Sequence, residues 1–217
     1  MPFAMTHLLI AHNIIKDTPQ IKNPNDFMLG SVAPDSVHNR SNYDSDMKFK
    51  SHLCVGNEKW GRVTNNDEWA KNVLAFLDKN RNANNKDFIY GYCCHILADI
   101  QNNIKIWTPF RKSIEGNSEK GNMYHEESYI IDYELYLHPE RKKIWEYLEK
   151  STAYDINDIV KESEINLMKQ RILGESYVDR ESIDVSENEY VTLPNIIEFI
   201  SEESKYIKNI LYGKTWL

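Results

Sequence analysis

The chain has 217 residues, of which 41% are hydrophobic and 12% aromatic, so it can bury one sizeable core and we expect a single domain over residues 1–217. Its formal net charge of -7 at pH 7 argues against a general attraction for nucleic acid, and we expect no stable nucleic-acid complex. No run approaches the roughly 18 apolar residues of a membrane span, and the apolar start of the chain lacks a positively charged leader. We therefore predict a cytoplasmic protein with neither a transmembrane segment nor a signal peptide.

The first predicted helix covers residues 6–16, with Thr6 as its N-cap and His7 in its first turn. A proline-containing loop over residues 17–25 follows. Further on, Pro34 disfavours the α conformation in the residue before it, so a new helical turn should begin there, with Asp35 and His38 on one face. A lone Asp after a proline is commonly only a helix cap.

Residues 39–49 are polar and predict a loop, and His52 comes next as an isolated histidine beside apolar neighbours. Residues 65–77 place apolar side chains at helical spacing and predict a packing helix. An asparagine-rich connection then leads to the central helix.

This central helix is predicted over residues 87–104, and the junction at residues 107–109 should end it. His95 and Asp99 lie four residues apart within its apolar run, and therefore on one face. Burying both side chains is costly unless a cation or a mutual hydrogen bond compensates. Taken alone, the pair is compatible with a metal site and equally with a His–Asp hydrogen bond in a core helix.

The remaining chain predicts helices separated by polar connections. Residues 111–122, charged and with two glycines, predict an exposed loop. A long helix follows, carries His125 and Asp132 on one face, and is interrupted at Pro139. Further helices are predicted over residues 140–150, 155–173 and 194–212, and the polar segment 176–191 predicts a surface loop or a small lid. With no strand pattern and no internal repeat, the predicted fold class is all-α.

Five candidate metal ligands lie in separate short motifs: His7 in THLL, Asp35 in GSVAPD, His52 in KSHL, and His95 with Asp99 in GYCCHILAD. They are all imidazoles or carboxylates, a donor set that suits zinc or another divalent ion in a catalytic site. A carboxylate that bridges two ions is the usual way to hold them close together for phosphoryl displacement.

The ordered motifs MTHL, LGSVAPD, SHL, GYCCHILADI and HEESYIIDYELY resemble the bacterial zinc-dependent phospholipase C family, of which this chain would be a divergent member. That family is similar to single-strand nucleases of the P1 type, which share its all-α fold. The likeness spans residues 3–137. It implies a single-domain multi-helix bundle of this type, which the helices within residues 155–212 would complete.

The resemblance also implies two zinc ions and a role for each motif residue. His7 would bind one ion, Asp35 would be both a ligand and the catalytic general base, His52 and His95 would bind the partner ion, and Asp99 would bridge the pair. A metal-activated water would attack the phosphorus of a small phosphoester substrate or phospholipid head group while the ions stabilise the developing negative charge.

One departure from the family concerns the start of the chain. Secreted members begin, after processing, with a tryptophan whose amino group and carbonyl bind zinc, whereas this chain begins with MPF. We expect His38 or solvent to take that place.

A second departure concerns the third zinc of the family. Its histidine comes six residues after the bridging carboxylate, where this chain has Lys105, and its other ligands form an HxxxE pair, whereas His125 is followed four residues later by Tyr129. We therefore predict a two-metal core, with a weak extra site that uses His125, Glu127 or Asp132.

The leading hypothesis is a zinc-dependent phosphoester hydrolase of the phospholipase C type. A nuclease or nucleotide phosphatase with the same site is the closest alternative, and it would need an aromatic platform for bases and a basic track. A non-catalytic, metal-stabilised helical binding protein is an alternative from another class. Its coordination would be closed by four protein ligands, whereas an enzyme keeps a position open.

Overall fold

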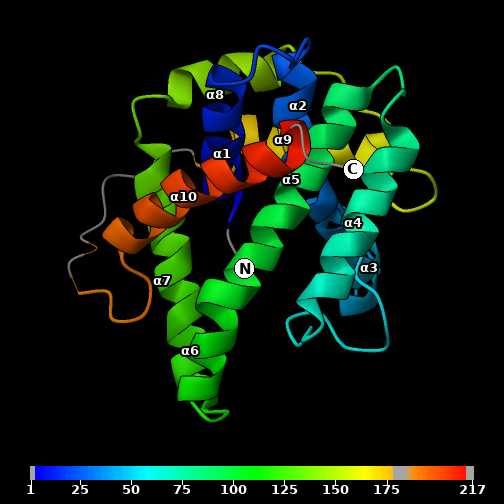
Figure 1. Cartoon of the computed structure of the whole chain (residues 1–217). Helices are drawn as coiled ribbons and strands as arrows, with labels where there is room; N and C mark the ends of the chain where they lie inside the picture. The colour runs from blue at the N-terminus through cyan, green and yellow to red at the C-terminus, as the bar shows by residue number, and fades with distance from the viewer. Residues whose placement is uncertain (1–2, 178–184, 186, 214–217) are drawn as a thin grey trace.

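The computed structural model describes residues 3–177, 185 and 187–213. This part of the chain folds into ten α-helices, a 3₁₀ segment and a π-helical turn, and its only β pairing is an isolated bridge between Ile156 and Val160 (Figure 1). The predicted all-α fold is confirmed. The elements are α1 (Ala4–Lys16), α2 (Pro24–Gly30), η1 (Ala33–Asn39, 3₁₀), α3 (Ser45–Ser51), α4 (Asn66–Asn80), α5 (Lys86–Asn102), η2 (Asn103–Trp107, π), α6 (Thr108–Ser113), α7 (Ser118–Tyr136), α8 (Arg141–Glu149), α9 (Glu162–Gly174) and α10 (Leu193–Tyr212).

Helix α5 is the predicted central helix. Figure 1 shows it running through the middle of the molecule, and it packs against α1, α2, α4 and α10. Nearly all of its 17 residues are buried as a result. A helix enclosed on all sides is apolar around its whole circumference, so the buried polar residues His95 and Asp99 need a specific chemical explanation.

The closest packing of α5 is against α2, through two glycines. A Cβ added to Gly91 would lie 2.0 Å from the Phe27 carbonyl oxygen, and one added to Gly30 would lie 2.2 Å from the Phe88 carbonyl oxygen. The two backbones therefore touch directly. This contact also fixes the position of Ser31, the C-cap of α2, beside α5.

The start of α1 differs from its prediction. The helix begins at Ala4 with Phe3 as N-cap, and Thr6 is a buried helical residue rather than the cap. The Met5 backbone N–H donates instead to a carboxylate oxygen of Asp132 in α7, at 2.8 Å. Backbone N–H groups in the first turn of a helix commonly bond to a nearby capping side chain. Here the Met5 N–H instead bonds to a side chain of another helix, far away in the sequence.

The segment 39–49, predicted as a loop, contains most of α3. Asp44 caps this helix by accepting hydrogen bonds from the backbone N–H groups of Asp46 and Met47. The prediction was wrong because the segment is polar overall, and the cap that starts the helix lies inside it. The error matters because α3 brings Lys48 and then His52 toward α5.

Helix α5 also does not end where predicted. The π-helical turn η2, in which the Thr108 N–H reaches the Asn103 carbonyl, leads directly into α6. Pro109 lies in the first turn of α6, where proline is tolerated. The exposed loop predicted over residues 111–122 is correspondingly short, because α7 begins at Ser118.

The C-terminal half follows its prediction more closely. The interruption at Pro139 is confirmed, since it falls between α7 and α8. Helix α9 begins only at Glu162, whose N–H donates to the Asp155 side chain at 2.7 Å. Of the loop or lid predicted over residues 176–191, residues 178–184 and 186 lie outside the described residues. No helix in the described part of the chain has the length and apolarity needed to span a membrane.

Candidate metal centre and adjoining pocket

The structure brings the five predicted ligands into one buried cluster. They come from four places in the fold: His7 from α1, Asp35 from η1, His52 from the end of α3, and His95 with Asp99 from α5. Within the cluster two groups each place one ligand atom per residue within 4.8 Å of the others, namely His7 with His95 and Asp99, and Asp35 with His52 and His95. The groups share His95, so they are parts of a single site.

Asp99 lies at the centre of this site. Its Oδ1 is 3.5 Å from His7 Nε2, and its Oδ2 is 3.1 Å from His52 Nε2 and 3.7 Å from His95 Nε2. One carboxylate therefore faces three imidazoles, which is the arrangement a bridging ligand requires.

Backbone carbonyls orient two of the histidines. The His95 Nδ1 atom is 2.8 Å from the Ser31 carbonyl oxygen, and the His52 Nδ1 atom is 2.9 Å from the Lys48 carbonyl oxygen. Each Nδ1–H can donate to its carbonyl, which leaves Nε2 as a lone pair directed into the cluster. These two Nε2 atoms are 3.1 Å apart. Two facing lone pairs at that distance require a proton or a cation between them.

Several buried donors and acceptors of the cluster also lack hydrogen-bond partners. Both oxygens of Asp99 and both ring nitrogens of His7 are in this state. An unsatisfied buried polar group is costly, and a cation would satisfy several of these atoms at once. Because the donor set is nitrogen and oxygen only, the residues present fit zinc or a similar divalent ion.

A proton is the competing occupant. Burial lowers the pKa of His95 to about 3. Burial also opposes protonation of His52, but the neighbouring carboxylates of Asp35 and Asp99 raise its pKa above the ordinary value. These directions favour a proton on His52 over one on His95 when no cation is bound, and metal binding would release such a proton.

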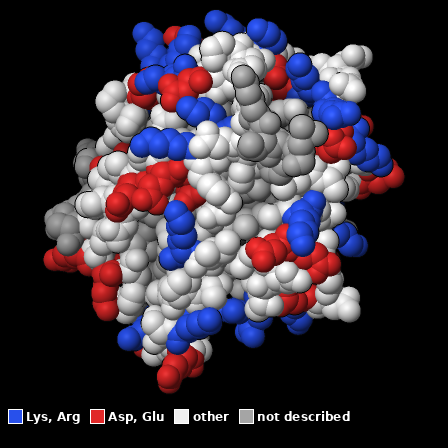
Figure 2. Space-filling model, viewed as in Figure 1, with Lys and Arg blue, Asp and Glu red and all other residues white. Residues whose placement is uncertain are grey.

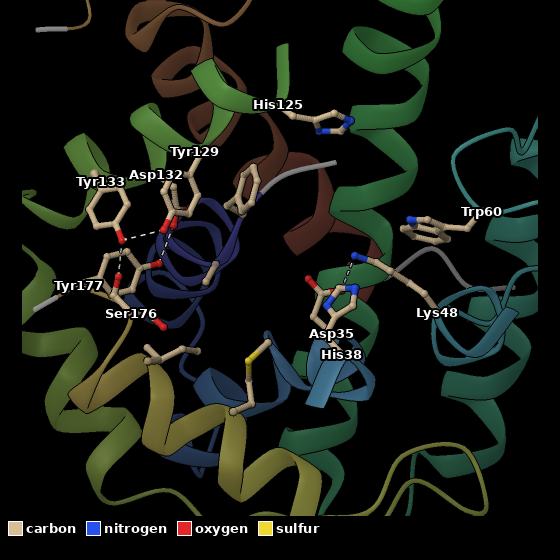
Figure 3. Close-up of a pocket in the computed structure, with 14 residues that line it drawn as sticks. Asp35, His38, Lys48, Trp60, His125, Tyr129, Asp132, Tyr133, Ser176 and Tyr177 are labelled. Atoms are coloured by element: carbon tan, nitrogen blue, oxygen red, sulfur yellow. Dashed lines mark hydrogen bonds and ion pairs between the residues drawn. The ribbon is translucent and has the colours of Figure 1, made fainter. Parts of the chain in front are cut away.

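A cavity of about 400 Å³ adjoins the cluster. Figure 3 shows Asp35, His38, Lys48 and Trp60 grouped at one side, and Tyr129, Asp132, Tyr133, Ser176 and Tyr177 at the other. Of the five clustered residues only Asp35 lines the cavity. Asp35 is therefore the link between the buried cluster and a space that a substrate can enter.

Lys48 is the site residue that sequence reasoning missed. Its ammonium lies 2.8 Å from Asp35 Oδ1 and 5.0 Å from the centroid of the Trp60 ring. Burial alone would lower the pKa of Lys48, but the Asp35 charge raises it, so the ion pair keeps its charge. The sequence feature that could have pointed to Lys48 is its spacing of four residues from His52. In a helix this spacing places both side chains on one face, but residues 45–51 were predicted to belong largely to a loop.

The four weaker candidates lie outside the cluster. His38 lines the cavity with its Nε2 atom 3.0 Å from the Tyr43 hydroxyl. Glu127 accepts three backbone N–H groups from residues 189–191, and Asp132 accepts hydrogen bonds from Met5 N–H and the Tyr177 hydroxyl. None of the four belongs to a group able to hold an ion among the described residues, and the extra site remains a prediction.

His125→Ala is expected to leave the metal content unchanged. His125 lines the cavity and its ring lies 5.6 Å from that of Trp107, so its loss should cost stability of about 1 kcal/mol. Elemental mass spectrometry of the variant and the wild type, purified in parallel, checks this. Loss of one ion per chain would show that His125 belongs to the centre.

Asp132→Asn is expected to change how stability depends on pH. Burial raises the pKa of Asp132 from 3.8 to about 6. As the pH rises through that interval the unfolded chain loses a proton that the folded protein retains, so folding is disfavoured by up to roughly 3 kcal/mol above about pH 6. Asn has no such cost, and its amide can still accept from Met5 N–H.

The measurement is urea unfolding of both proteins at several values between about pH 4 and pH 7. The stability of the variant relative to the wild type should rise across this range and level off above it. A difference that does not vary with pH would contradict the raised pKa of Asp132.

These observations define a class of protein: an all-α fold whose central helix and its neighbours build a buried His/Asp cluster suited to divalent metal ions. The family model described as zinc dependent phospholipase C matches residues 6–101. All five clustered residues lie within this range, so the match supports membership in that family for this part of the chain. The match ends before α7, so it does not include the HEESYIIDYELY motif. No curated protein and no solved structure matches the chain significantly.

Proposed function

We propose that the protein is a zinc-dependent phosphoester hydrolase of the phospholipase C type. Its centre would hold two divalent ions on His7, Asp35, His52, His95 and Asp99. The observation that carries the proposal is the surroundings of the buried Asp99 carboxylate. Neither of its oxygens has a hydrogen-bond partner among the described residues, and Nε2 atoms of three histidines lie 3.1 to 3.7 Å from them.

Three of the clustered residues have distinct parts in this function. His52 and His95 present Nε2 because carbonyls hold their Nδ1 atoms. Asp35, where the cluster meets the cavity, is placed to accept a proton from a water molecule that attacks phosphorus there. Divalent ions at such a centre supply Lewis-acid stabilisation of the negative charge that develops on the phosphoryl group.

The cavity supports a small phosphoester or a phospholipid head group as substrate. On the face shown in Figure 2, Lys and Arg are interspersed with Asp and Glu rather than gathered into a continuous track. A single-strand nuclease would use such a track, and this face does not provide one.

One observation favours a second candidate, a metal-stabilised protein without catalysis. Four of the five ligands are fully buried, and only Asp35 is partly exposed. A closed coordination shell is typical of structural zinc. Whether the bound ions turn over a substrate therefore decides between the two candidates.

The test is metal content followed by a substrate screen. Protein purified without a metal-affinity tag should contain about two zinc or other divalent ions per chain by elemental mass spectrometry. The loaded protein should then hydrolyse a chromogenic phosphomonoester, phosphodiester or phosphocholine ester. Bound metal without any turnover would favour the structural role. No stoichiometric metal after reconstitution would contradict both candidates.

A further inference from the structure

Lys48 is the one strongly basic group of the cavity. Among the described residues that line it, no other Lys or Arg is present. The Lys48 side chain is 10% exposed and lies over the face of Trp60. A buried ammonium requires an anion beside it, and in this structure that anion is Asp35.

The partner of Lys48 is also a member of the metal cluster. The same oxygen, Asp35 Oδ1, lies 2.8 Å from Lys48 Nζ and 3.4 Å from His52 Nε2. A divalent ion held by this cluster would compete with the ammonium for that oxygen. Metal loading would therefore leave the Lys48 charge less well compensated and directed toward the cavity.

We propose that Lys48 binds the anionic oxygen of a phosphoryl group in this cavity, and that it therefore binds a dianionic phosphate group more tightly than a monoanionic one. The inference rests on the proposed function, because it assumes that ions are bound at the cluster. A fixed positive charge attracts a dianion about twice as strongly as a monoanion at the same distance. The ring of Trp60, over which the ammonium lies, also lines the cavity.

A purely structural role for Lys48 makes a different prediction. If the ammonium only neutralises Asp35, its removal changes stability and metal affinity but not the affinity of the loaded protein for phosphate. The two roles are therefore separated by phosphate binding, which requires no catalysis.

The experiment titrates inorganic phosphate, and separately dimethyl phosphate, into the zinc-loaded protein by calorimetry. Lys48→Met should weaken phosphate binding by about tenfold or more and dimethyl phosphate binding by less, as expected for the loss of a charge-assisted contact. Lys48→Arg, which keeps the charge, should retain most of the affinity. Lys50→Met is the matched control, because Lys50 lies in the same helix and is exposed.

Zinc stoichiometry is measured first for each protein. If the wild type binds no zinc, the proposed function fails and this inference with it. If zinc is bound and Lys48→Met binds phosphate as tightly as the wild type, the inference alone is overturned. A second readout uses wild-type protein carrying ¹³C-labelled lysine and so avoids any effect of substitution on folding. Phosphate should shift the Lys48 Cε resonance of the zinc-loaded protein but not that of Lys50. An unshifted Lys48 resonance would also overturn the inference.

Discussion

Asp99→Asn is expected to remove at least one metal ion per chain and to abolish the stabilisation of the protein by zinc. Asn cannot carry the negative charge or bridge two ions, and the three imidazoles around Asp99 would be left without their shared carboxylate. Zinc at about a thousand times its dissociation constant stabilises a folded protein by roughly 4 kcal/mol. For a chain of this size that corresponds to a melting temperature higher by about 8 to 16 °C.

The measurement combines elemental mass spectrometry with thermal unfolding in the presence and absence of zinc. Asp78→Asn is the matched control, because Asp78 is 73% exposed on α4 and pairs there with the exposed Arg81. The control should keep the full zinc-dependent rise in melting temperature. Normal metal content and a normal rise in Asp99→Asn would show that Asp99 does not bridge the ions and that its burial has another explanation.

Gly91→Ala is expected to cause a large loss of stability that does not depend on bound metal. The new methyl group would lie 2.0 Å from the Phe27 carbonyl oxygen, a separation that only movement of α2 away from α5 can relieve. Overpacking a core usually costs about 1 to 3 kcal/mol, and a clash with backbone belongs at or above the upper end of that range. The movement would also withdraw the Ser31 carbonyl from His95 Nδ1.

Urea unfolding gives the stability, and zinc affinity reports the position of His95. Gly174→Ala at the end of α9 is the control, because an added Cβ would meet no atom within 4 Å. That variant should match the wild type or be slightly more stable, since alanine favours helix. A Gly91→Ala protein of normal stability and zinc affinity would be incompatible with the direct backbone contact between α2 and α5.

The amino-acid sequence by itself determined the helical elements and which residues share a face. His95 and Asp99 point in one direction because four residues make about one helical turn, and that relation does not depend on the rest of the fold. The same local logic correctly placed the interruption of the helical chain at Pro139. It failed at residues 45–51, where the Asp44 cap starts a helix within a polar segment. It also failed at Pro109, because a π-helical turn connects α5 to α6 where a proline was expected to end the helix.

Only the tertiary structure decided how these side chains are used. The Ser31 carbonyl orients His95 across 64 positions of sequence, and Asp132 satisfies the first turn of α1 across 127. Lys48 acquires its importance from Asp35, on a different element. Periodicity describes neighbours along one helix, whereas hydrogen bonds and ion pairs between elements depend on how helices pack. The sequence therefore contained the candidate ligands, and the packing of α2, η1 and α3 around α5 determined their geometry and added Lys48 to the site.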